Sequence, residues 1–141
     1  LTIKHYQSFC SKVTLFDNFS DDDTREIALS MGCEVKLFGK KGVLSDKEYL
    51  AVKNHCWKKS RADWVIVCDS DEILWHPNLQ EALKEDCTIF TTYGWNIYSN
   101  DVPHESYLEI TDGYHDGNYS KSVIFNPIAV TVVTTTTLKA I

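Results

Sequence analysis

The stretch Trp64-Val65-Ile66-Val67-Cys68-Asp69-Ser70-Asp71-Glu72 decides the fold class. Its first five residues are all apolar, which is typical of a strand covered on both faces. The next four are polar, and three of them are acidic. In open α/β sheets, ligands bind outside the carboxyl ends of the strands. The stretch therefore predicts a buried strand that ends in a candidate ligand site.

Strand-like and helix-like patterns alternate on both sides of this stretch. Helical spacing of apolar residues occurs at 1–11, 20–32, 45–60 and 77–83, and strand-like runs occur at 13–16, 34–38 and 88–92. Ser45 and Glu48 have capping-box spacing, and Gly32 suits the end of a helix. Such alternation predicts an α/β fold with a doubly wound, mainly parallel sheet.

Length and charge narrow the function classes. The chain has 141 residues, a length typical of about one domain. Its longest apolar run, 64–68, is far shorter than the roughly 20 residues of a membrane-spanning helix, so no transmembrane segment is expected. The formal net charge is −6, and the sequence shows no basic face of the kind that is typical of nucleic-acid-binding proteins. An anionic ligand would therefore need a cation or a local basic patch to bind.

The cysteines indicate a reducing compartment. There are five, which is an odd number, and they are too scattered for a zinc site. We expect reduced thiols that act as small core residues, and hence a cytoplasmic location. The first residues, 1–5, are too polar for a signal peptide.

Two acidic clusters follow predicted strands. Asp69 and Asp71 would project to the same side of an extended chain, where two carboxylates attract a hard divalent cation that can bridge to a diphosphate. The alternative is that these acids are solvated or cap the next segment. Asp17 and Asn18 follow the first strand, where a carboxylate can accept hydrogen bonds from a nucleobase or a ribose. Their alternative is a turn bonded to its own backbone.

Several segments together resemble one family. Residues 17–28 look like the D-N-x-S-x-D-x-T-x-E-I-A stretch of glycosyltransferase family 2-like proteins with the GT-A fold. Residues 51–54 and 62–72 are similar to that family's A-x-x-N, A-D-W and D-x-D-E motifs, and 93–96 and 119–127 also resemble it. The resemblance covers residues 1–127 in order.

This resemblance implies a metal-dependent transferase. It would move a sugar, with inversion, from a nucleotide-diphospho-sugar donor to a hydroxyl of a carbohydrate or other acceptor. Mn²⁺ or Mg²⁺ would be the cofactor, held by Asp69 and Asp71. The donor would contact five residues: Asp17, Asn18, Asn54, Asp69 and Lys121. For Asn54 a structural role in its helix, and for Lys121 an ordinary surface lysine, remain alternatives.

An inverting transfer also needs a general base. Residues 93–126 show little periodicity and are predicted to be rich in loops. The acidic residues of this loop-rich segment are the candidates: Asp101, Glu105, Glu109, Asp112 and Asp116. We select Asp112 and Asp116 because they precede the Tyr-Ser-Lys run at 119–121. Trp95 is a candidate for stacking on a sugar face, and a core position is its alternative.

The resemblance also predicts where the domain is incomplete. Family members usually have a strand before the point where this chain starts, so residues 1–127 would form a GT-A-like nucleotide-sugar-binding domain without its usual first strand. Residues 128–141 resemble nothing in the family and form a β-prone tail, either a closing strand or unpaired. The chain would then be truncated at both ends, which leaves a non-catalytic nucleotide- or partner-binding remnant as the alternative function.

Overall fold

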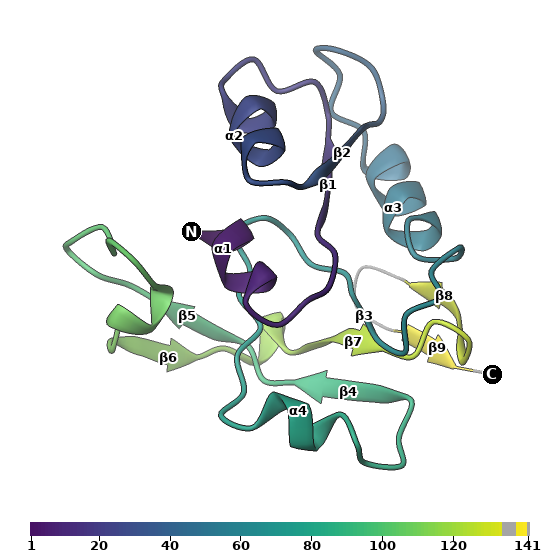
Figure 1. Ribbon diagram of the computed structural model, residues 1–141, viewed down its shortest axis with the longest axis vertical. Coiled ribbons are helices and arrows are strands. Elements are labelled where there is room, and N and C mark those ends of the chain that lie inside the picture. The colour runs from purple at the N-terminus through teal and green to yellow at the C-terminus, as the bar shows by residue number, and fades with distance from the viewer. Residues whose placement is uncertain (134–137, 141) are drawn as a thin grey trace.

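Helices and short strands alternate along the chain in the computed structural model, which describes residues 1–133 and 138–140 (Figure 1). The first part contains α1 (Thr2–Gln7), β1 (Thr14–Asp17), α2 (Thr24–Ser30), β2 (Glu34–Leu37), α3 (Asp46–His55), β3 (Val65–Ile66), α4 (Leu79–Ala82) and β4 (Ile89–Thr92). The second part contains β5 (Trp95–Ile97), η1 (Tyr107–Glu109), β6 (Gly113–His115), η2 (Gly117–Tyr119), β7 (Lys121–Phe125), β8 (Val130–Val133) and β9 (Leu138–Ala140). The expected mixture of helices and strands is confirmed.

The described strands form small separate sheets instead of one doubly wound sheet. β1 pairs with β2 in parallel, with Leu15 opposite Val35. β7 lies between β3 and β4 and is antiparallel to both. β5 with β6, and β8 with β9, form antiparallel pairs. The expected mainly parallel arrangement thus holds only for β1 and β2 in the described part of the chain, because a strand from the loop-rich segment separates β3 from β4.

Local signals explain the end of α2 and the start of α3. The Ser45 hydroxyl accepts the Glu48 backbone N–H at 3.4 Å at the start of α3, as its capping-box spacing predicted. Gly32 follows α2 with φ +78°, a conformation that suits glycine. α3 ends at His55, short of the predicted 60, and Trp57 then turns inward while its indole N–H donates to the Lys53 carbonyl at 2.9 Å.

The core lies where α3 approaches the β3–β7–β4 sheet and β8. Trp57, Phe125 and Val130 are buried together, and the Trp57 and Phe125 rings meet edge-on at 5.2 Å. The β-prone segment starting at 128 therefore contributes Val130 to the core. It continues as the β8–β9 pair, and residues 134–137 and 141 lie outside the described residues.

The sequence also led us to expect reduced cysteines and no transmembrane segment. All five cysteines are free thiols: Cys10, Cys33, Cys56, Cys68 and Cys87. Burial raises the thiol pKa of Cys10, Cys33, Cys56 and Cys68. Among residues 1–133 and 138–140, every helix is too short or too polar to cross a bilayer.

The buried ring of Phe125 gives a prediction about stability. Phe125→Ala should lower the free energy of unfolding by about 3–5 kcal/mol, because it leaves a cavity against Trp57. Urea denaturation followed by tryptophan fluorescence measures this loss. The matched control is Ile128→Ala, since Ile128 is 84% exposed and should change stability by less than about 0.5 kcal/mol. Equal losses in the two variants would contradict the placement of the core.

Candidate functional site

The acidic loop, residues 69–72, follows β3 and folds back on itself. The Glu72 backbone N–H donates to the Asp69 carbonyl at 3.1 Å. In return, the Asp69 backbone N–H donates to Glu72 Oε2, also at 3.1 Å. The two ends of the loop are therefore tied together, and the Asp69 and Glu72 carboxylates belong to one tight turn. The expectation that an extended chain places Asp69 and Asp71 on the same side is wrong, because β3 ends at Ile66 and residues 69–72 turn back.

Helix α1 fixes this loop from the other side. The buried Tyr6 hydroxyl donates to the Glu72 carbonyl at 2.9 Å and accepts the Leu74 N–H at 3.0 Å and the Cys68 thiol at 3.3 Å. Thr2 Oγ1 donates to the Ser70 carbonyl at 2.8 Å. Burial raises the pKa of the Tyr6 hydroxyl far above its usual value, so it stays a neutral donor. The turn between β3 and residue 74 is thus held by defined hydrogen bonds.

Two lysines from different elements reach the acidic loop. Lys53 on α3 places Nζ 2.8 Å from Asp69 Oδ1, and the Tyr49 hydroxyl donates to the same oxygen. Lys121, the first residue of β7, forms an ion pair with Glu72 Oε1. The side chains of the two ion pairs are between 18% and 30% exposed, so these charges are partly withdrawn from water. We call Tyr49, Lys53, Lys121 and the acidic loop the charged cluster.

Charges in this cluster perturb one another. Burial raises the pKa of Asp69, the nearby Glu72 and Asp71 carboxylates raise it further, and Lys121 opposes them. Burial and the charge of Lys121 lower the pKa of Lys53, while Glu72 and Asp71 oppose that change. Asp71 itself is exposed. The cluster therefore holds three carboxylates against two ammonium groups, and one negative charge remains uncompensated.

The carboxylate oxygens of the charged cluster supply some, but not all, of the ligands that a hard cation needs. Asp69 and Asp71 supply carboxylate oxygens, which Mg²⁺ and Mn²⁺ prefer. The residues described contain no group of three or more His, Cys, Asp or Glu side chains able to hold a metal ion. The chain's own oxygens would thus need ligand oxygens to complete a coordination shell. The residual negative charge fits that arrangement, and the metal assignment of Asp69 and Asp71 stays a prediction.

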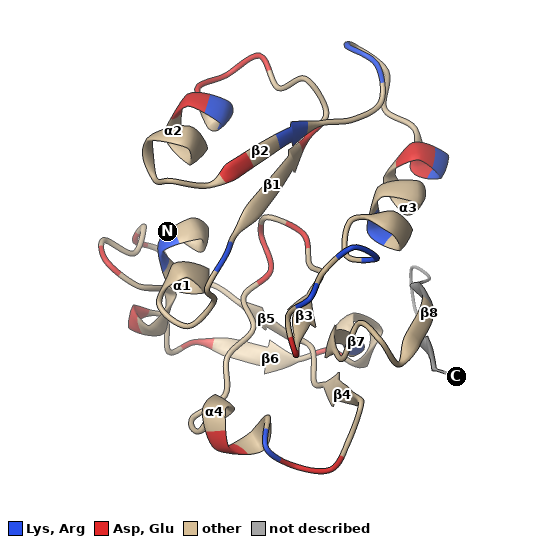
Figure 2. Cartoon of the chain, turned by 45° about the vertical axis from the view of Figure 1, so that its right-hand side comes forward, with Lys and Arg blue, Asp and Glu red and all other residues tan. Residues whose placement is uncertain are grey.

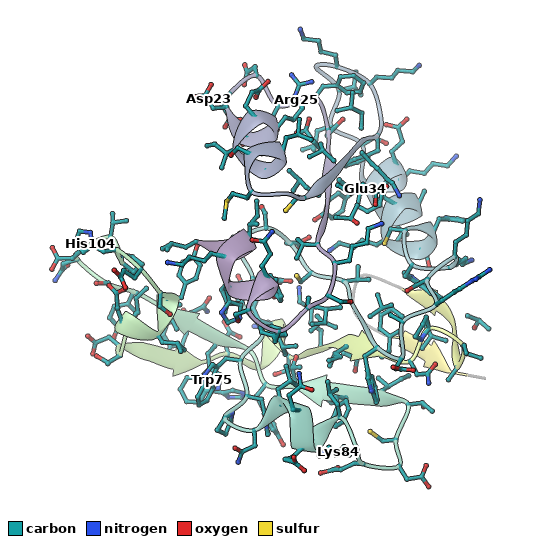
Figure 3. All side chains as sticks on the ribbon, viewed as in Figure 1. Asp23, Arg25, Glu34, Trp75, Lys84 and His104 are labelled. Carbon is teal, nitrogen blue, oxygen red and sulfur yellow. The ribbon has the colours of Figure 1, made fainter. Side chains whose placement is uncertain are left out.

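Asp17 is occupied by its own turn. It is buried, and its carboxylate accepts the Ser20 backbone N–H at 3.1 Å and the Ser20 hydroxyl. Arg25 Nε lies 3.6 Å from Asp17 Oδ2, and Figure 3 shows Arg25 on α2. Within the described part of the chain, no hydrogen bond or ion pair joins Asp17 to the acidic loop. The structure thus has the self-bonded turn that was the alternative to nucleoside binding, and the donor contact stays a prediction.

Asn18 and Asn54 also bond within their own surroundings. Asn18 Nδ2 donates to the Val43 carbonyl at 3.0 Å, while its Oδ1 is buried without a hydrogen-bond partner among the described residues. Gly39 has φ +70°, and a Cβ there would lie 2.7 Å from that Oδ1, so a larger residue at this position would be strained. Asn54 Nδ2 donates to the Leu50 carbonyl one turn earlier in α3. Neither donor-site assignment is tested by these contacts.

The candidate bases lie on the β5–β6 hairpin and beside it. Asp116 caps η2 by accepting the Asn118 N–H at 3.0 Å, and its other oxygen accepts Asn96 Nδ2 at 3.3 Å. Asp112 is exposed and precedes β6. The described residues show no hydrogen bond or ion pair from either aspartate to the acidic loop. Their role as bases stays a prediction that the contacts do not support.

Glu109 is the acidic residue of this segment whose function is plainly structural. Its carboxylate accepts three backbone N–H groups, those of His104, Glu105 and Ser106, at 2.8–3.0 Å. These bonds lower the Glu109 pKa. A carboxylate held in this way is a poor proton acceptor, which removes Glu109 from the candidate bases.

Trp95 lies on the surface. Its side chain is 61% exposed, Tyr93 is 79% exposed, and both rings contact His115 edge-on at about 6 Å. The core position that was the alternative for Trp95 is wrong, because β5 pairs only with β6 in the described residues and leaves the ring uncovered. This aromatic surface of Tyr93, Trp95 and His115 is available to a ligand.

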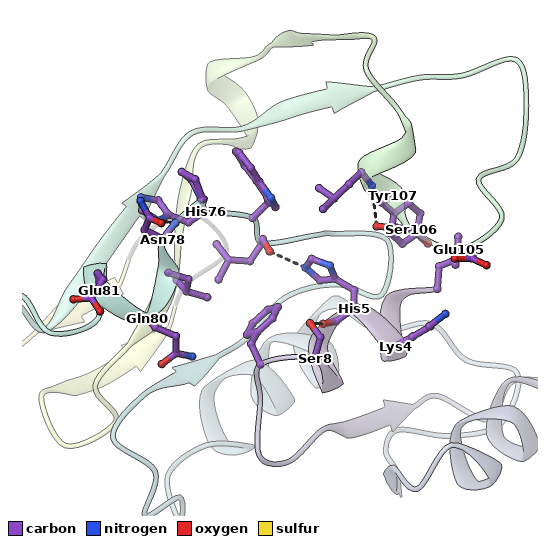
Figure 4. A pocket seen from close by; sticks show the side chains of 17 residues that line it. Lys4, His5, Ser8, His76, Asn78, Gln80, Glu81, Glu105, Ser106 and Tyr107 are labelled. Atoms are coloured by element: carbon purple, nitrogen blue, oxygen red, sulfur yellow. Dashed lines mark hydrogen bonds between the residues drawn. The ribbon is translucent and has the colours of Figure 1, made fainter.

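A cavity of about 600 Å³ lies beside α1 (Figure 4). Its walls come from α1, from residues 74–81 and from residues 105–108, and its lining is mainly apolar. His5 Nε2 lies 2.8 Å from the Leu74 carbonyl, and Trp75 on the same segment is 58% exposed. The segment that leaves the acidic loop therefore forms one wall of this cavity.

Lys53 and Tyr49 are the members of the cluster that the sequence analysis missed. They are four residues apart on α3, so they share one face of the helix. That spacing was visible in the sequence. What was not visible is that this face approaches the end of β3, because no local pattern predicts which strand end a helix face meets. Figure 2 shows charged segments of α3 and of the chain after β3.

Comparison of the chain with protein-family models, with curated proteins and with solved structures finds no match.

The Tyr6 hydroxyl gives a prediction about the acidic loop. Tyr6→Phe should destabilise the protein by about 1–3 kcal/mol, because the half-buried Glu72 carbonyl and Leu74 N–H lose their partner. Amide hydrogen exchange should rise at residues 70–74 in particular. Tyr114→Phe is the control, because Tyr114 is 56% exposed. Unchanged exchange at 70–74 would show that the Tyr6 hydroxyl does not hold the loop.

A second prediction concerns the ionisation of Asp69. Glu72→Gln should lower the pKa of Asp69, because it removes a neighbouring negative charge while keeping an oxygen that can accept the Asp69 N–H. Carbon-13 NMR of the aspartate carboxyl groups measures the titration. Glu48→Gln, a charge change on α3 outside the cluster, should leave the Asp69 pKa unchanged. A shift upward in Glu72→Gln would contradict the charge arrangement.

Proposed function

We propose that this chain binds a nucleotide-diphospho-sugar together with Mn²⁺ or Mg²⁺ and forms the donor-binding part of an inverting glycosyltransferase. The observation that carries the proposal is the charged cluster. A tight turn at the end of a strand presents partly buried carboxylates beside two lysines. Such a set matches the needs of a metal-bound diphosphate, which requires oxygen ligands for the cation and positive charge for the phosphates. The family resemblance of residues 17–28 and 62–72 points to the same chemistry.

The proposal gives each part of the cluster a task. Asp69 and Asp71 would hold the cation, and the bound cation would stabilise the charge of the departing nucleoside diphosphate. Lys121 would bind a phosphate oxygen. In the transfer, an acceptor hydroxyl oxygen forms the new bond to the anomeric carbon, the bond from that carbon to the diphosphate breaks, and the hydroxyl proton passes to a general base. Asp112 and Asp116 remain the proposed bases.

The assignment of the chain to a doubly wound, GT-A-like fold is part of this proposal. In the described residues β1 is paired only with β2, and β3 is paired only with β7, so each has an edge that no described strand covers. A doubly wound, mainly parallel sheet would need further strand pairing at these edges.

A second candidate function is a non-catalytic module that binds a nucleotide or a partner. The specific observation in its favour is the exposed aromatic surface of Tyr93, Trp95 and His115. Exposed aromatic residues are enriched at interaction sites. Binding of a nucleotide sugar without transfer to added acceptors and without donor hydrolysis would favour this second function over the first.

Metal-dependent nucleotide binding is the direct test. Isothermal titration with UDP, GDP and ADP and their glucose conjugates should detect binding of at least one of them in Mn²⁺ and none in EDTA. Asp71→Ala should weaken this binding at least roughly tenfold while leaving the thermal midpoint nearly unchanged, because Asp71 is exposed and proposed as a metal ligand.

The control variant is Asp63→Ala. Asp63 is also exposed and precedes β3, so the change in charge is the same outside the acidic loop. It should bind nucleotides like the wild type. A folded wild-type protein that binds none of the nucleotides in Mn²⁺, or an Asp71→Ala variant that binds as tightly as Asp63→Ala, would overturn the proposed function.

A further inference from the structure

Lys53 occupies an oxygen that the proposed cation would need. Its Nζ lies 2.8 Å from Asp69 Oδ1, and the Tyr49 hydroxyl donates to the same atom. Lys121 neutralises Glu72 in the same way from β7. The two lysines therefore supply positive charge beside the carboxylates that would hold the proposed metal ion. This step rests on the proposed function, since it assumes that a cation binds Asp69.

A cation at Asp69 and the ammonium of Lys53 compete for the same carboxylate. Partly exposed ion pairs of this kind are weak, so a divalent ion can displace the lysine. The Lys53 side chain is long and flexible, so its ammonium can leave Asp69 while α3 stays in place. Lys121 brings a second ammonium group to the same acidic loop, so a Lys53 ammonium released from Asp69 gains by meeting an anion.

We propose that Lys53 is a counter-ion that exchanges partners, pairing with Asp69 in the ligand-free protein and with a phosphate oxygen once the metal-bound diphosphate is present. The sequence analysis assigned no role to Lys53. The exchange makes metal and diphosphate bind cooperatively, because the metal releases the lysine that the diphosphate uses, and the diphosphate draws that lysine off Asp69. Such coupling is reciprocal between the two ligands.

The exchange has a signature that a merely structural lysine lacks. Lys53→Met should tighten Mn²⁺ binding without nucleotide by roughly fivefold, because the competing ammonium is gone. The same variant should weaken the binding of inorganic pyrophosphate in saturating Mn²⁺ by roughly tenfold, because a phosphate partner is lost. Two affinities that move in opposite directions distinguish partner exchange from general damage to the site.

Two further variants sharpen the measurement. Lys47→Met removes the same charge from an exposed position on α3 and should leave both affinities unchanged. Lys53→Arg keeps a positive charge beside Asp69 and should retain the weak affinity for Mn²⁺ alone. Titration calorimetry gives the affinities, and circular dichroism with thermal melting establishes that each variant is folded.

A measurement on the wild-type protein tests the exchange without any substitution. Brief acetylation followed by mass spectrometry reports the accessibility of each lysine amine. Mn²⁺ alone should raise the acetylation of Lys53, because it is released from Asp69, and adding pyrophosphate should lower it again. Lys47 should react equally in all three conditions.

The outcomes separate the two proposals. If the wild type binds Mn²⁺ and pyrophosphate, but Lys53→Met changes both affinities in the same direction or neither, the exchange is wrong and the donor-binding function stands. Unchanged Lys53 acetylation in saturating Mn²⁺ also overturns the exchange. If the folded wild type binds neither Mn²⁺ nor pyrophosphate in Mn²⁺, both proposals fail.

Discussion

The structure depends on keeping three carboxylates together at the end of one strand. Asp69, Asp71 and Glu72 lie within four residues, and burial together with repulsion from Glu72 and Asp71 raises the pKa of Asp69. Two kinds of contact oppose that repulsion. The Tyr6 hydroxyl and Thr2 fix the backbone of the turn, and the lysines compensate its charge. Because backbone and charge are held by different elements, the charge partners can change while the turn stays in place.

This arrangement explains why separate small sheets still build one site. β3 supplies the acidic loop and its neighbour β7 begins with Lys121, while α3, which packs toward the same core through Trp57, supplies Lys53. The antiparallel insertion of β7 brings its first residue to the end of β3, where the loop begins. A parallel strand in that place would put its first residue at the opposite end of β3. The departure from a mainly parallel sheet is thus what positions Lys121.

The sequence predicted the local features and missed the pairings. The cap at Ser45, the turn at Gly32 and the strand before Asp69 each depend on a few neighbouring residues. The structure contains the cap and the turn, and it contains the strand in a shorter, half-buried form, Val65–Ile66. The position of β7 between β3 and β4 depends on contacts between residues far apart in the chain. The residue pattern at 121–125 did not predict it. Lys53 was missed for the same reason, since its partner lies on another element. The core position considered for Trp95 rested on its being aromatic. An aromatic residue type does not reveal whether another element covers the ring.

Asp17 and Asp69 show how electrostatics narrows the choice between two similar patterns. Both are acidic residues at strand ends, and both were candidates for ligand binding. Asp17 is buried, and its acceptors are taken up by Ser20 and Arg25, so a ligand would have to replace partners held within the same short segment. Asp69 is half-exposed, repelled by two neighbouring carboxylates and paired with a lysine on a flexible stem. A cationic ligand would relieve the repulsion around Asp69, whereas at Asp17 it would have to displace Arg25. Under the proposed function, a cation is therefore expected at the acidic loop and not at the end of β1.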